Sequence, residues 1–585
     1  MGDKTYYIGL SVTYHDPALA IVDDQGEPLF AEGAERHLQS KRALNGDADP
    51  LFRLPALLRE HCPEAGRFVL ACNWRKSRPW YERAAAALGL LSAEGLARPG
   101  IKRLGSPLEN HQIHHMMACN RLSIARGGLN LAQVLREHYP SCRVEFRDFD
   151  HHDTHAASAC HASPYADAAC AVVDSYGENG SMAFYRYRDG RLKRLSAARG
   201  LGSLGLYYMR LTELCGFDWM KGEEWKVMGL APYGRLDEEI YSLLKDVLRV
   251  RGLGLEHPRG RLFPALAALA KRRSRGGPAK TAEEAANWAF TGQYYFAEIM
   301  ADIISNFHSA YPCDRLALAG GCALNSSFNG QITARTPFKE VYIPPAPADD
   351  GTALGAAWLA LSGDRPGLPR RAEPLSPYLG ASLSGEALAR LARFGGGLDI
   401  RHLPDTLCEE TARLLARGKL VAWAQGRAEF GPRALGNRSI LADPRDPGMK
   451  DRINTQVKFR EEYRPFAPAI LHEHGPDYFQ DYCETPYMEQ ALRFREQAKA
   501  AVPAVVHVDG TGRLQTVKQA WNPRFHRLLD AFHRETGVPV LLNTSFNVMG
   551  KPIIHSVEDA AAVLMTCGLD ALAAGDWLFA KPGVL

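Results

Sequence analysis

A segment rich in proline, glycine and charged residues divides this chain into two unequal parts. It reads SGDRPGLPRRAEPLSP and spans residues 362–377. This composition is typical of a linker between domains. At 585 residues the chain is also too long for a single hydrophobic core. We therefore predict two domains, with residues 1–365 forming the first and residues 366–585 the second.

The first part contains one pattern of strands twice. TYYIGLSVTYHDPALAIVDDQGEPLFAEGAER, at residues 5–36, reads as a strand, a polar turn, a second strand and then a third. ADAACAVVDSYGENGSMAFYRYRDGRLKRLSAA, at residues 166–198, repeats this plan, and each copy has an acidic residue near its first turn. The repetition predicts a duplicated β-sheet core. Hairpins with such turns are common, so the repeat alone does not identify a fold.

The bulk composition excludes several classes of protein. Hydrophobic residues make up 46% and charged residues 23% of the chain, as in soluble globular proteins. The net charge of +4 is small, which argues against a nucleic-acid partner. No apolar run approaches the length of a membrane span, and the N-terminus lacks the pattern of a secretory signal. The twelve cysteines include no C-x-x-C pair, so we predict a cytoplasmic protein with reduced cysteines.

Three histidines and two aspartates occur together in FDHHDTHAASA, at residues 149–159. His151 and His155 are four residues apart, a spacing that places two side chains on one face of a helix. A helix offers two imidazole ligands to one metal ion in this way. The pair is only half of a metal site, so the remaining ligands must come from elsewhere in the chain.

A second candidate site follows a predicted strand at Leu316–Ala319. The strand runs into Gly320 and Gly321, and a helix is predicted from Asn325. Glycines at such a turn let the backbone approach a ligand, and a helix N-terminus favours an anion. These three residues are therefore candidates for nucleotide binding.

The second part has a different character. Residues 427–464 contain nine Lys and Arg against six Asp and Glu, interspersed with glycine, proline and aromatic residues without a helical period. The pattern indicates a phosphate or nucleotide pocket, with a solvated basic face as the plain alternative. Further on, VPVLLNTSFNVMGKPII reads as a buried strand entering a polar turn that could hold a ligand.

Together these motifs resemble the O-carbamoyltransferases that modify natural products, including the tobramycin, cephamycin, ansamycin and nodulation-factor enzymes. The resemblance rests on motifs in the same order along nearly the whole chain. They include IGLSVTYHDPALAIV, HHDTHA, VVDSYGENGS, KVMGLAPYG, AGGCALNSSFNG, DDGTALGAA, GRAEFGPRALGNRSILADPR, VKFREEYRPFAP and NTSFNVMGKPI. The run FGPRALGNRSIL is the most specific of them.

The resemblance implies a fold and a reaction for each domain. The N-terminal domain resembles the threonylcarbamoyl-transfer ATPase of the actin-like, sugar-kinase superfamily, and the C-terminal domain resembles the YrdC-like fold; both are α/β. The C-terminal site is implied to make carbamoyl-adenylate from carbamoyl phosphate and ATP with Mg²⁺. The adenylate then passes internally to the N-terminal site, where a hydroxyl of a small-molecule acceptor attacks the carbamoyl carbon.

The resemblance also assigns residues in the first domain. The implied ligands of a divalent metal, with Fe²⁺ favoured, are His151, His155, Asp174 and Asp349, and Asp350 is the alternative to Asp349. His15 matches a histidine near the reacting centre, a candidate general base. The tobramycin-type motif has an acid two residues before this histidine, whereas this chain has Thr13. The acceptor is therefore expected to be chosen differently.

In the second domain the resemblance implies contacts with carbamoyl phosphate and ATP. Arg433, Lys458 and Arg464 are the implied catalytic residues. Further implied substrate contacts are Arg438, Arg513, Asn543 and Ser545, although Arg438 and Asn543 could equally be structural. Met488 lies where the family lines the channel or the acceptor side, and core packing is an equally good interpretation.

Two other functions account for part of the sequence. A small-molecule kinase of the actin-like superfamily explains the first domain but leaves residues 380–585 without a role. A transferase of the threonylcarbamoyl type acting on tRNA is the nearest functional relative. The acceptor is not identified by any motif, although residues 75–145 are predicted to shape its pocket. A homodimer is possible.

Overall fold

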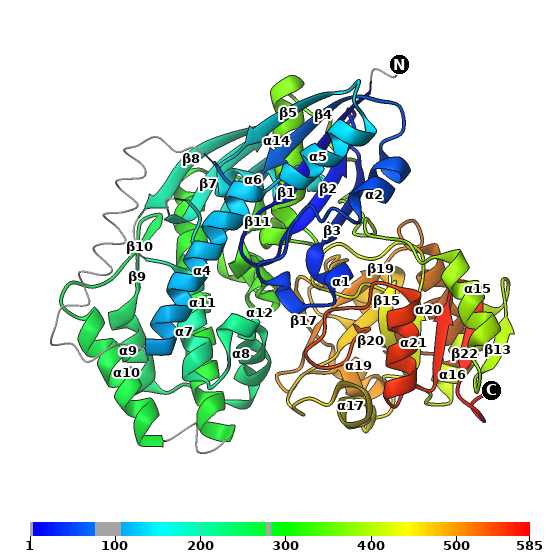
Figure 1. The fold of residues 1–585 in the computed structure, drawn as a ribbon. Helices are drawn as coiled ribbons and strands as arrows, with labels where there is room; N and C mark the ends of the chain where they lie inside the picture. Colours follow the sequence, from blue (N-terminus) through cyan, green and yellow to red (C-terminus); the bar gives the residue numbers. More distant parts are fainter. Residues whose placement is uncertain (1–3, 77–106, 179, 200–201, 277–281) are drawn as a thin grey trace.

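The computed structural model describes residues 4–76, 107–178, 180–199, 202–276 and 282–585. The ribbon in Figure 1 has a part formed mainly by the blue, cyan and green segments and a second part that runs from yellow-green to red. Of the segment predicted to shape the acceptor pocket, residues 75–145, the stretch 77–106 lies outside the described residues.

Two five-stranded sheets in the first part have the same topology. The first has the order β3-β2-β1-β4-β5, and the second has the order β8-β7-β6-β11-β12. In each sheet the first three strands are antiparallel neighbours and the last two join in parallel. The strands are β1 (Lys4–Ser11), β2 (Ala18–Val22), β3 (Pro28–Gly33), β4 (Ala65–Cys72), β5 (Arg143–Asp148), β6 (Asp167–Val173), β7 (Gly180–Arg188), β8 (Arg191–Arg199), β11 (Arg315–Ala319) and β12 (Glu340–Tyr342). The duplicated core predicted from the repeat is confirmed.

Two helices that lie against each other connect these sheets. Helix α14 (Thr352–Asp364) packs on β1, β2 and β4, and α6 (His151–Ala162) packs on α14 and on β6 and β11. Glycines permit the close approach. A Cβ at Gly9 would lie 1.8 Å from the carbonyl oxygen of Ala353, and one at Gly355 would lie 1.8 Å from that of Thr154. This packing fixes the first turns of α6 and α14 beside each other.

Helices surround the two sheets. They are α1 (Ala34–Leu38), α2 (Leu54–His61), α4 (Pro107–Arg126), α5 (Leu129–His138), α7 (Leu204–Leu214), α8 (Glu224–Leu230), α9 (Glu238–Val247), α10 (Leu262–Gly276), α11 (Ala282–Ala310), α12 (Ser326–Asn329) and α13 (Ile332–Arg335). Helices α8 and α9 pack on α11, while α10 packs on α9. A small hairpin, β9 (Arg249–Arg251) and β10 (Gly254–Glu256), joins α9 to α10. The long helix α11 contributes Trp288, Phe296 and Phe307 to the buried core.

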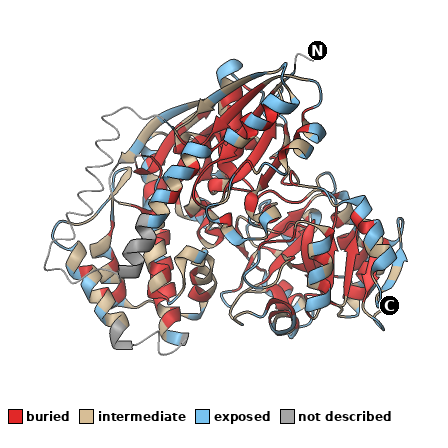
Figure 2. Ribbon diagram, viewed as in Figure 1, coloured by how far each residue is buried: buried red, intermediate tan, exposed pale blue. Residues whose placement is uncertain are grey.

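The second part is built on one mixed sheet of eight strands. Its order is β13-β22-β21-β14-β15-β20-β16-β19. The strands are β13 (Asp399–His402), β14 (Val421–Ala424), β15 (Arg438–Ala442), β16 (Ala467–Leu471), β19 (Gln515–Val517), β20 (Val540–Ser545), β21 (Ala571–Ala574) and β22 (Trp577–Ala580), and a separate pair is formed by β17 (Ala491–Arg493) and β18 (Thr511–Arg513). Figure 2 shows that buried residues follow the strands in both parts. The predicted α/β class, with mixed sheets, is confirmed.

The helices of the second part flank this sheet. They are α15 (Gly385–Phe394), α16 (Leu407–Ala416), α17 (Met449–Ile453), α18 (Gly475–Tyr478), α19 (Glu496–Ala501), α20 (Pro523–Thr536) and α21 (Val557–Thr566). Between α14 and α15 the chain has no helix or strand apart from one β-bridge, at Ser382. The two parts share an apolar cluster in which Phe430 and Met488 pack with Tyr342 and Ala346. Met488 is therefore a core residue at this junction.

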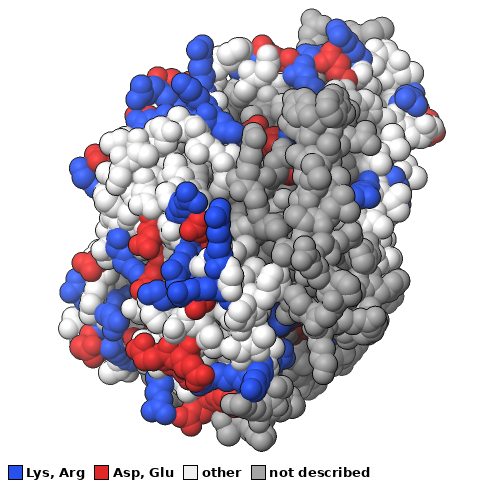
Figure 3. All heavy atoms as spheres, turned by 90° about the vertical axis from the view of Figure 1, so that its left-hand side faces the viewer, with Lys and Arg blue, Asp and Glu red and all other residues white. Residues whose placement is uncertain are grey.

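Charged side chains of both signs are mixed on the face beside α9 and α10. Figure 3 shows Lys and Arg interspersed with Asp and Glu over the part of this face that the structure describes. Arg251 pairs with Glu256, and Arg261 pairs with Asp246. Within the described ranges, no helix combines the length and the apolar character needed to span a membrane.

Candidate functional site

Helix α6 presents two buried histidines at its N-terminus. Asp150 caps the helix, its side chain accepting a hydrogen bond from the backbone of His152 at 3.1 Å. This cap starts the helix so that His151 and His155 lie on one face, as their spacing predicts. Their Nε2 atoms are 3.2 Å apart, and both residues are 1% exposed.

Two buried carboxylates complete a four-residue cluster. Asp174 directly follows β6, and Asp349 begins the short helix η5 (Asp349–Gly351) before α14. His151 Nε2 lies 3.4 Å from Asp174 Oδ2 and 3.5 Å from Asp349 Oδ1, and His155 Nε2 lies 3.4 Å from the same Asp349 oxygen. The four ligand atoms all lie within 4.8 Å of one another. Asp349 rather than Asp350 belongs to this cluster.

The predicted glycine turn helps to build this cluster. Gly321 donates its backbone N–H to Asp174 Oδ1 at 3.1 Å, which leaves Oδ2 facing the histidines. Gly320 has φ +92°, and a Cβ there would lie 2.3 Å from the carbonyl oxygen of Val173. Asn325 caps α12 through Phe328 and exchanges side-chain hydrogen bonds with Gln293. In this structure the predicted nucleotide contacts therefore have protein partners.

The pKa values of His151 and Asp349 in this cluster are strongly perturbed. Burial would lower the pKa of His151, but the charge of Asp349 and hydrogen bonds to both aspartates outweigh it and raise that pKa to about 10. Burial likewise opposes ionisation of Asp349, yet the charge of His151 holds the pKa of this carboxyl well below its usual range. The electrostatics therefore favour two carboxylates facing a positive charge.

The cluster fits a divalent metal ion. Donor atoms about 2.1 Å from a tetrahedral ion are separated by about 3.4 Å. Three of the four distances between histidine nitrogens and carboxylate oxygens match this value, and the fourth, from His155 to Asp174, is 4.0 Å. Two imidazoles with two carboxylates suit a transition metal such as iron or zinc. The residues therefore meet the requirements of the predicted site, whichever of these ions it holds.

His15 lies at the edge of the cluster. Its Nδ1 atom is 2.9 Å from Asp16 Oδ2 and 3.7 Å from Asp349 Oδ2, and its side chain is 30% exposed. It is the only predicted catalytic residue in the first part, and it can reach both the cluster and solvent. Thr13 donates its hydroxyl to the carbonyl oxygen of His15 at 2.7 Å, so it supports the backbone of this histidine.

Lys458 occupies a buried pocket of oxygens in the second part. It ends the π-helix η6 (Asn454–Lys458), an element that often marks functional sites. Its ammonium donates to the backbone of Ser545, to Ser545 Oγ at 3.3 Å and to Asn547 Oδ1 at 2.8 Å. No acidic residue pairs with it among the described residues. Burial and the charges of Arg460 and Arg464 lower its pKa well below the usual value.

Three predicted arginines gather near this lysine with little compensating charge. Within the described ranges, Arg433 and Arg513 have no side-chain hydrogen bond or ion pair, and Arg464 has only Glu461, at 3.7 Å. Burial lowers the pKa of Arg433 to about 10. Burial and the charges of the neighbouring arginines lower that of Arg513 well below its usual value. Such a concentration of unpaired cations provides a site for a multiply charged anion.

Arg460 belongs to the same group but escaped the sequence prediction. Its Nε donates to Asn454 Oδ1 at 2.7 Å, its guanidinium lies 4.4 Å from the ring centroid of Phe466, and its Nη2 is buried without a partner. Its charge contributes to the lowered pKa of Lys458 and of Arg513. Its place in VKFREEYRPFAP, between two implied ligands, is the signal that could have indicated it.

Two other predicted contacts are already occupied by protein groups. Arg438 is fully buried and donates to the carbonyl oxygens of Gln425 at 2.6 Å and Ala381 at 3.0 Å, among others. Asn543 donates to the Gln515 side chain at 2.7 Å. The structural interpretation of Arg438 and Asn543 is therefore the better one, although Asn543 Oδ1 is buried without a partner.

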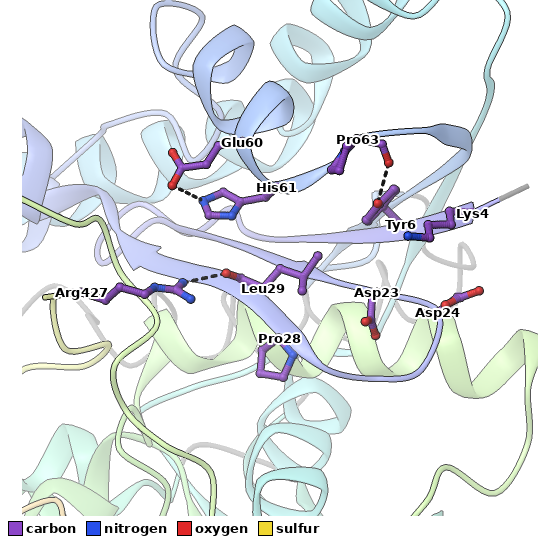
Figure 4. A pocket seen from close by; sticks show the side chains of 10 residues that line it. All are labelled: Lys4, Tyr6, Asp23, Asp24, Pro28, Leu29, Glu60, His61, Pro63 and Arg427. Carbon is purple, nitrogen blue, oxygen red and sulfur yellow. Dashed lines mark hydrogen bonds and ion pairs between the residues drawn. The ribbon is translucent and has the colours of Figure 1, made fainter. Parts of the chain in front are cut away.

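A separate surface cavity of about 440 Å³ lies where the two parts meet. Figure 4 shows its lining, with the side chain of Arg427 reaching the carbonyl oxygen of Leu29 across the junction. None of the predicted site residues lines this cavity.

Comparison with known proteins follows the two parts of the structure. The family model described as the carbamoyltransferase N-terminus matches residues 129–358, and that described as the carbamoyltransferase C-terminus matches residues 412–581. Nodulation protein NolO of Bradyrhizobium diazoefficiens is 36% identical over 439 residues, which cover 74% of this chain and 79% of that protein. The chain belongs to the O-carbamoyltransferase family. The predicted class of enzyme, a carbamoyltransferase, is thereby confirmed.

One further relative extends this result. The 3'-hydroxymethylcephem-O-carbamoyltransferase of Amycolatopsis lactamdurans is 38% identical over 261 residues, which cover 45% of this carbamoyltransferase and 48% of that enzyme. Among solved structures, full-length HypF in a phosphate- and nucleotide-bound form has a TM-score of 0.36 and 10% identity, covering 63% of this chain and 56% of that one. That structural similarity is too low to support a conclusion about this carbamoyltransferase.

Proposed function

We propose that this O-carbamoyltransferase works through carbamoyl-adenylate, which residues 366–585 form and residues 1–365 use. The observation that carries the proposal is the group of cations around Lys458 and Arg433, in which the described residues form a single ion pair, that of Arg464 with Glu461. A folded chain retains such charges where a polyanion compensates them. Carbamoyl phosphate and ATP together form such a polyanion.

The adenylation step balances as follows. Water splits carbamoyl phosphate into carbamate and inorganic phosphate, and a carbamate oxygen then attacks the α-phosphorus of ATP while pyrophosphate leaves. The attacking oxygen and the triphosphate repel each other, so Arg433, Arg464 and Arg513 neutralise that repulsion and fix the geometry for in-line attack. Lys458 and Ser545 hold the phosphate oxygens at the base of the site. ATP enters with Mg²⁺, and we assign a YrdC-like fold to this part.

In the first part, His151, His155, Asp174 and Asp349 would hold a divalent metal ion, which we propose is Fe²⁺. When bound, such an ion supplies a positive charge that attracts phosphate or ribose oxygens of the adenylate. The helix cap at Asp150 and the backbone N–H of Gly321 keep the protein ligands in place. We assign this part to the actin-like superfamily on the strength of its duplicated sheets.

His15 is positioned to take a proton from the acceptor. The acceptor oxygen forms a bond to the carbamoyl carbon, the bond from that carbon to the AMP oxygen breaks, and AMP leaves. Nε2 is the free nitrogen of His15, because Nδ1 faces Asp16. The acceptor is a hydroxyl group of a small molecule, and Thr13 in place of the tobramycin-type acid leaves one anionic contact fewer for it. Three expectations stay predictions: that the protein is cytoplasmic, that it has no nucleic-acid partner, and that it forms a homodimer.

The deciding experiment measures exchange of labelled pyrophosphate into ATP with the full-length chain, with and without carbamoyl phosphate. We expect exchange only when carbamoyl phosphate is present. ADP formation without exchange would instead support a kinase of the actin-like superfamily. Carbamoyl transfer to tRNA, measured in parallel, would support the threonylcarbamoyl-type alternative.

A further inference from the structure

A short segment of the first part, residues 34–45, has an unusual backbone. Gln39, Arg42, Ala43 and Asn45 all have positive φ, at 49°, 60°, 42° and 59°. Residues other than glycine rarely adopt this conformation, and the surrounding structure must hold them in it. Such residues concentrate at functional sites, yet no step of the proposed reaction uses these side chains.

One end of the segment is anchored beside His15. Arg42 donates from Nη2 to Asp16 Oδ2 at 3.2 Å and from Nε to the same oxygen at 3.3 Å. The backbone N–H of Asp16 donates in return to the carbonyl oxygen of Arg42 at 2.8 Å. The same Asp16 oxygen faces His15 Nδ1 at 2.9 Å. These contacts tie the segment to the transfer site.

The other end reaches into the second part. Arg36 is 3% exposed, and its Nη2 donates to the carbonyl oxygen of Gly431 at 2.7 Å. That is its one side-chain hydrogen bond within the described ranges. Gly431 lies two residues before Arg433. A first-part guanidinium therefore binds the backbone of the loop that carries a proposed adenylation residue.

Backbone contacts also restrict the loop around Gly431 on its other side. Gly431 has φ +107°, and a Cβ there would lie 2.3 Å from the carbonyl oxygen of Pro345. The neighbouring backbone N–H of Phe430 donates to the carbonyl oxygen of Pro377 at 2.7 Å. The loop is thus held by Arg36 on one side and by Pro345 and Pro377 on its other sides. All three residues lie outside the eight-stranded sheet of the second part. The position of Arg433 depends on these contacts.

We infer that Arg36 is a positioning residue for the adenylation step, acting across the junction through the carbonyl of Gly431. The inference rests on the proposed function, because it concerns the placement of Arg433 in that reaction. Arg433 has no side-chain partner of its own among the described residues, so its backbone must set where its guanidinium lies. Misplacement of such a group by about 1 Å can cost on the order of 100-fold in rate.

The test uses carbamoyl-phosphate-dependent exchange of pyrophosphate into ATP by full-length variants. Arg36→Met should lower the rate 10- to 100-fold, and Arg36→Lys, which keeps one donor, should restore part of it. The double variant Arg36→Met with Arg433→Met should exchange pyrophosphate almost as fast as Arg433→Met alone. Both changes remove the same contribution, that of a correctly placed Arg433 side chain, to the exchange rate. A purely structural role predicts that the two losses multiply.

The matched control is Arg427→Met. Arg427 also donates across the junction, to the carbonyl oxygen of Leu29 at 2.7 Å, but it does not contact Gly431 (Figure 4). This variant should retain at least half of the exchange rate. Circular dichroism and metal analysis of each variant check that it is folded. If Arg36→Met does not fold, Arg36→Lys is used for the measurement instead.

If the wild type shows exchange and Arg36→Met exchanges at the same rate, the inference is overturned and the proposed function is left intact. If only Arg36→Lys folds, a wild-type rate in that variant has the same meaning. Multiplying losses in the double variant would also overturn it. Absence of exchange in the wild type would overturn the proposed function, and this inference with it.

Discussion

A comparison of Arg433 and Arg438 tests which buried arginines of the second part bind a ligand and which support the fold. Arg433 lies in the loop before β15 and Arg438 is the first residue of that strand, and in both burial lowers the pKa from 12.5 to about 10. Each tenfold change in proton affinity corresponds to about 1.4 kcal/mol, so the folded chain disfavours each charge by about 3 kcal/mol. At pH 7 each guanidinium is protonated in both the folded and the unfolded chain, so the full penalty lowers the stability of the fold. This penalty is lost only as the pH rises from about 10 towards 12.5.

Replacing each arginine by methionine should have opposite effects. Arg433→Met removes a penalty without breaking a protein hydrogen bond. After an allowance for solvent screening on its partly exposed side, we expect about 1–2 kcal/mol of stabilisation and a melting temperature about 2–6 °C higher. Arg438→Met removes a penalty of the same size but leaves several buried carbonyl oxygens unpaired. That loss should outweigh the gain and destabilise the chain by about 2–5 kcal/mol.

Thermal unfolding with ligands completes the assay. A ligand at 100 times its dissociation constant stabilises the folded state by about 2.7 kcal/mol. MgATP with carbamoyl phosphate should therefore raise the melting temperature of the wild type, and it should raise that of Arg433→Met much less. If Arg433→Met melts as far below the wild type as Arg438→Met does, or gains as much from the ligands as the wild type, Arg433 is not held for an anion.

Three further predictions concern the two sites. Replacing His151 and His155 together by alanine should remove the bound metal, which elemental analysis of the purified protein checks; full occupancy in that variant would exclude the assignment. Lys458→Met should lower pyrophosphate exchange by about 10²–10³-fold while metal content stays unchanged, and a loss below tenfold would place Lys458 outside the reaction. His15→Ala should retain pyrophosphate exchange but lose carbamoyl transfer, because the acceptor hydroxyl loses its base; equal loss of both activities would point to one shared site.

How far the sequence predicts the four-residue cluster of histidines and aspartates depends on where these residues lie in the chain. His151 and His155 share one helix, so their spacing alone predicts that they meet. Asp174 follows a strand and Asp349 precedes a different helix, so no local pattern joins them to the histidines. Their assignment came from family resemblance, and the geometry of the duplicated sheets explains why they meet. Only that packing decides between Asp349 and its neighbour Asp350.

The glycine turn illustrates a different limit. Gly320 and Gly321 predict that something approaches the backbone closely, and this is correct, but the glycines do not say what approaches. In the structure the neighbours are the carbonyl of Val173 and the carboxylate of Asp174. Sequence likewise identifies the arginines of the second part without distinguishing a free guanidinium from one already bound, as Arg438 is. Arg36 carries no motif at all, because its role depends on a backbone carbonyl nearly 400 residues further along.

The different numbers of positive charges at the two sites suggest why the proposed intermediate would move in one direction. In the proposed reaction, the cations around Lys458 would bind carbamoyl phosphate and ATP while these carry several negative charges. Once phosphate and pyrophosphate have left, the adenylate carries a single negative charge, so the attraction that holds it there is much weaker. In the first part, a metal ion held by the four-residue cluster beside His15 would attract the one phosphate group that the adenylate keeps. On this proposal, departure of pyrophosphate would be the event that releases the adenylate towards the acceptor.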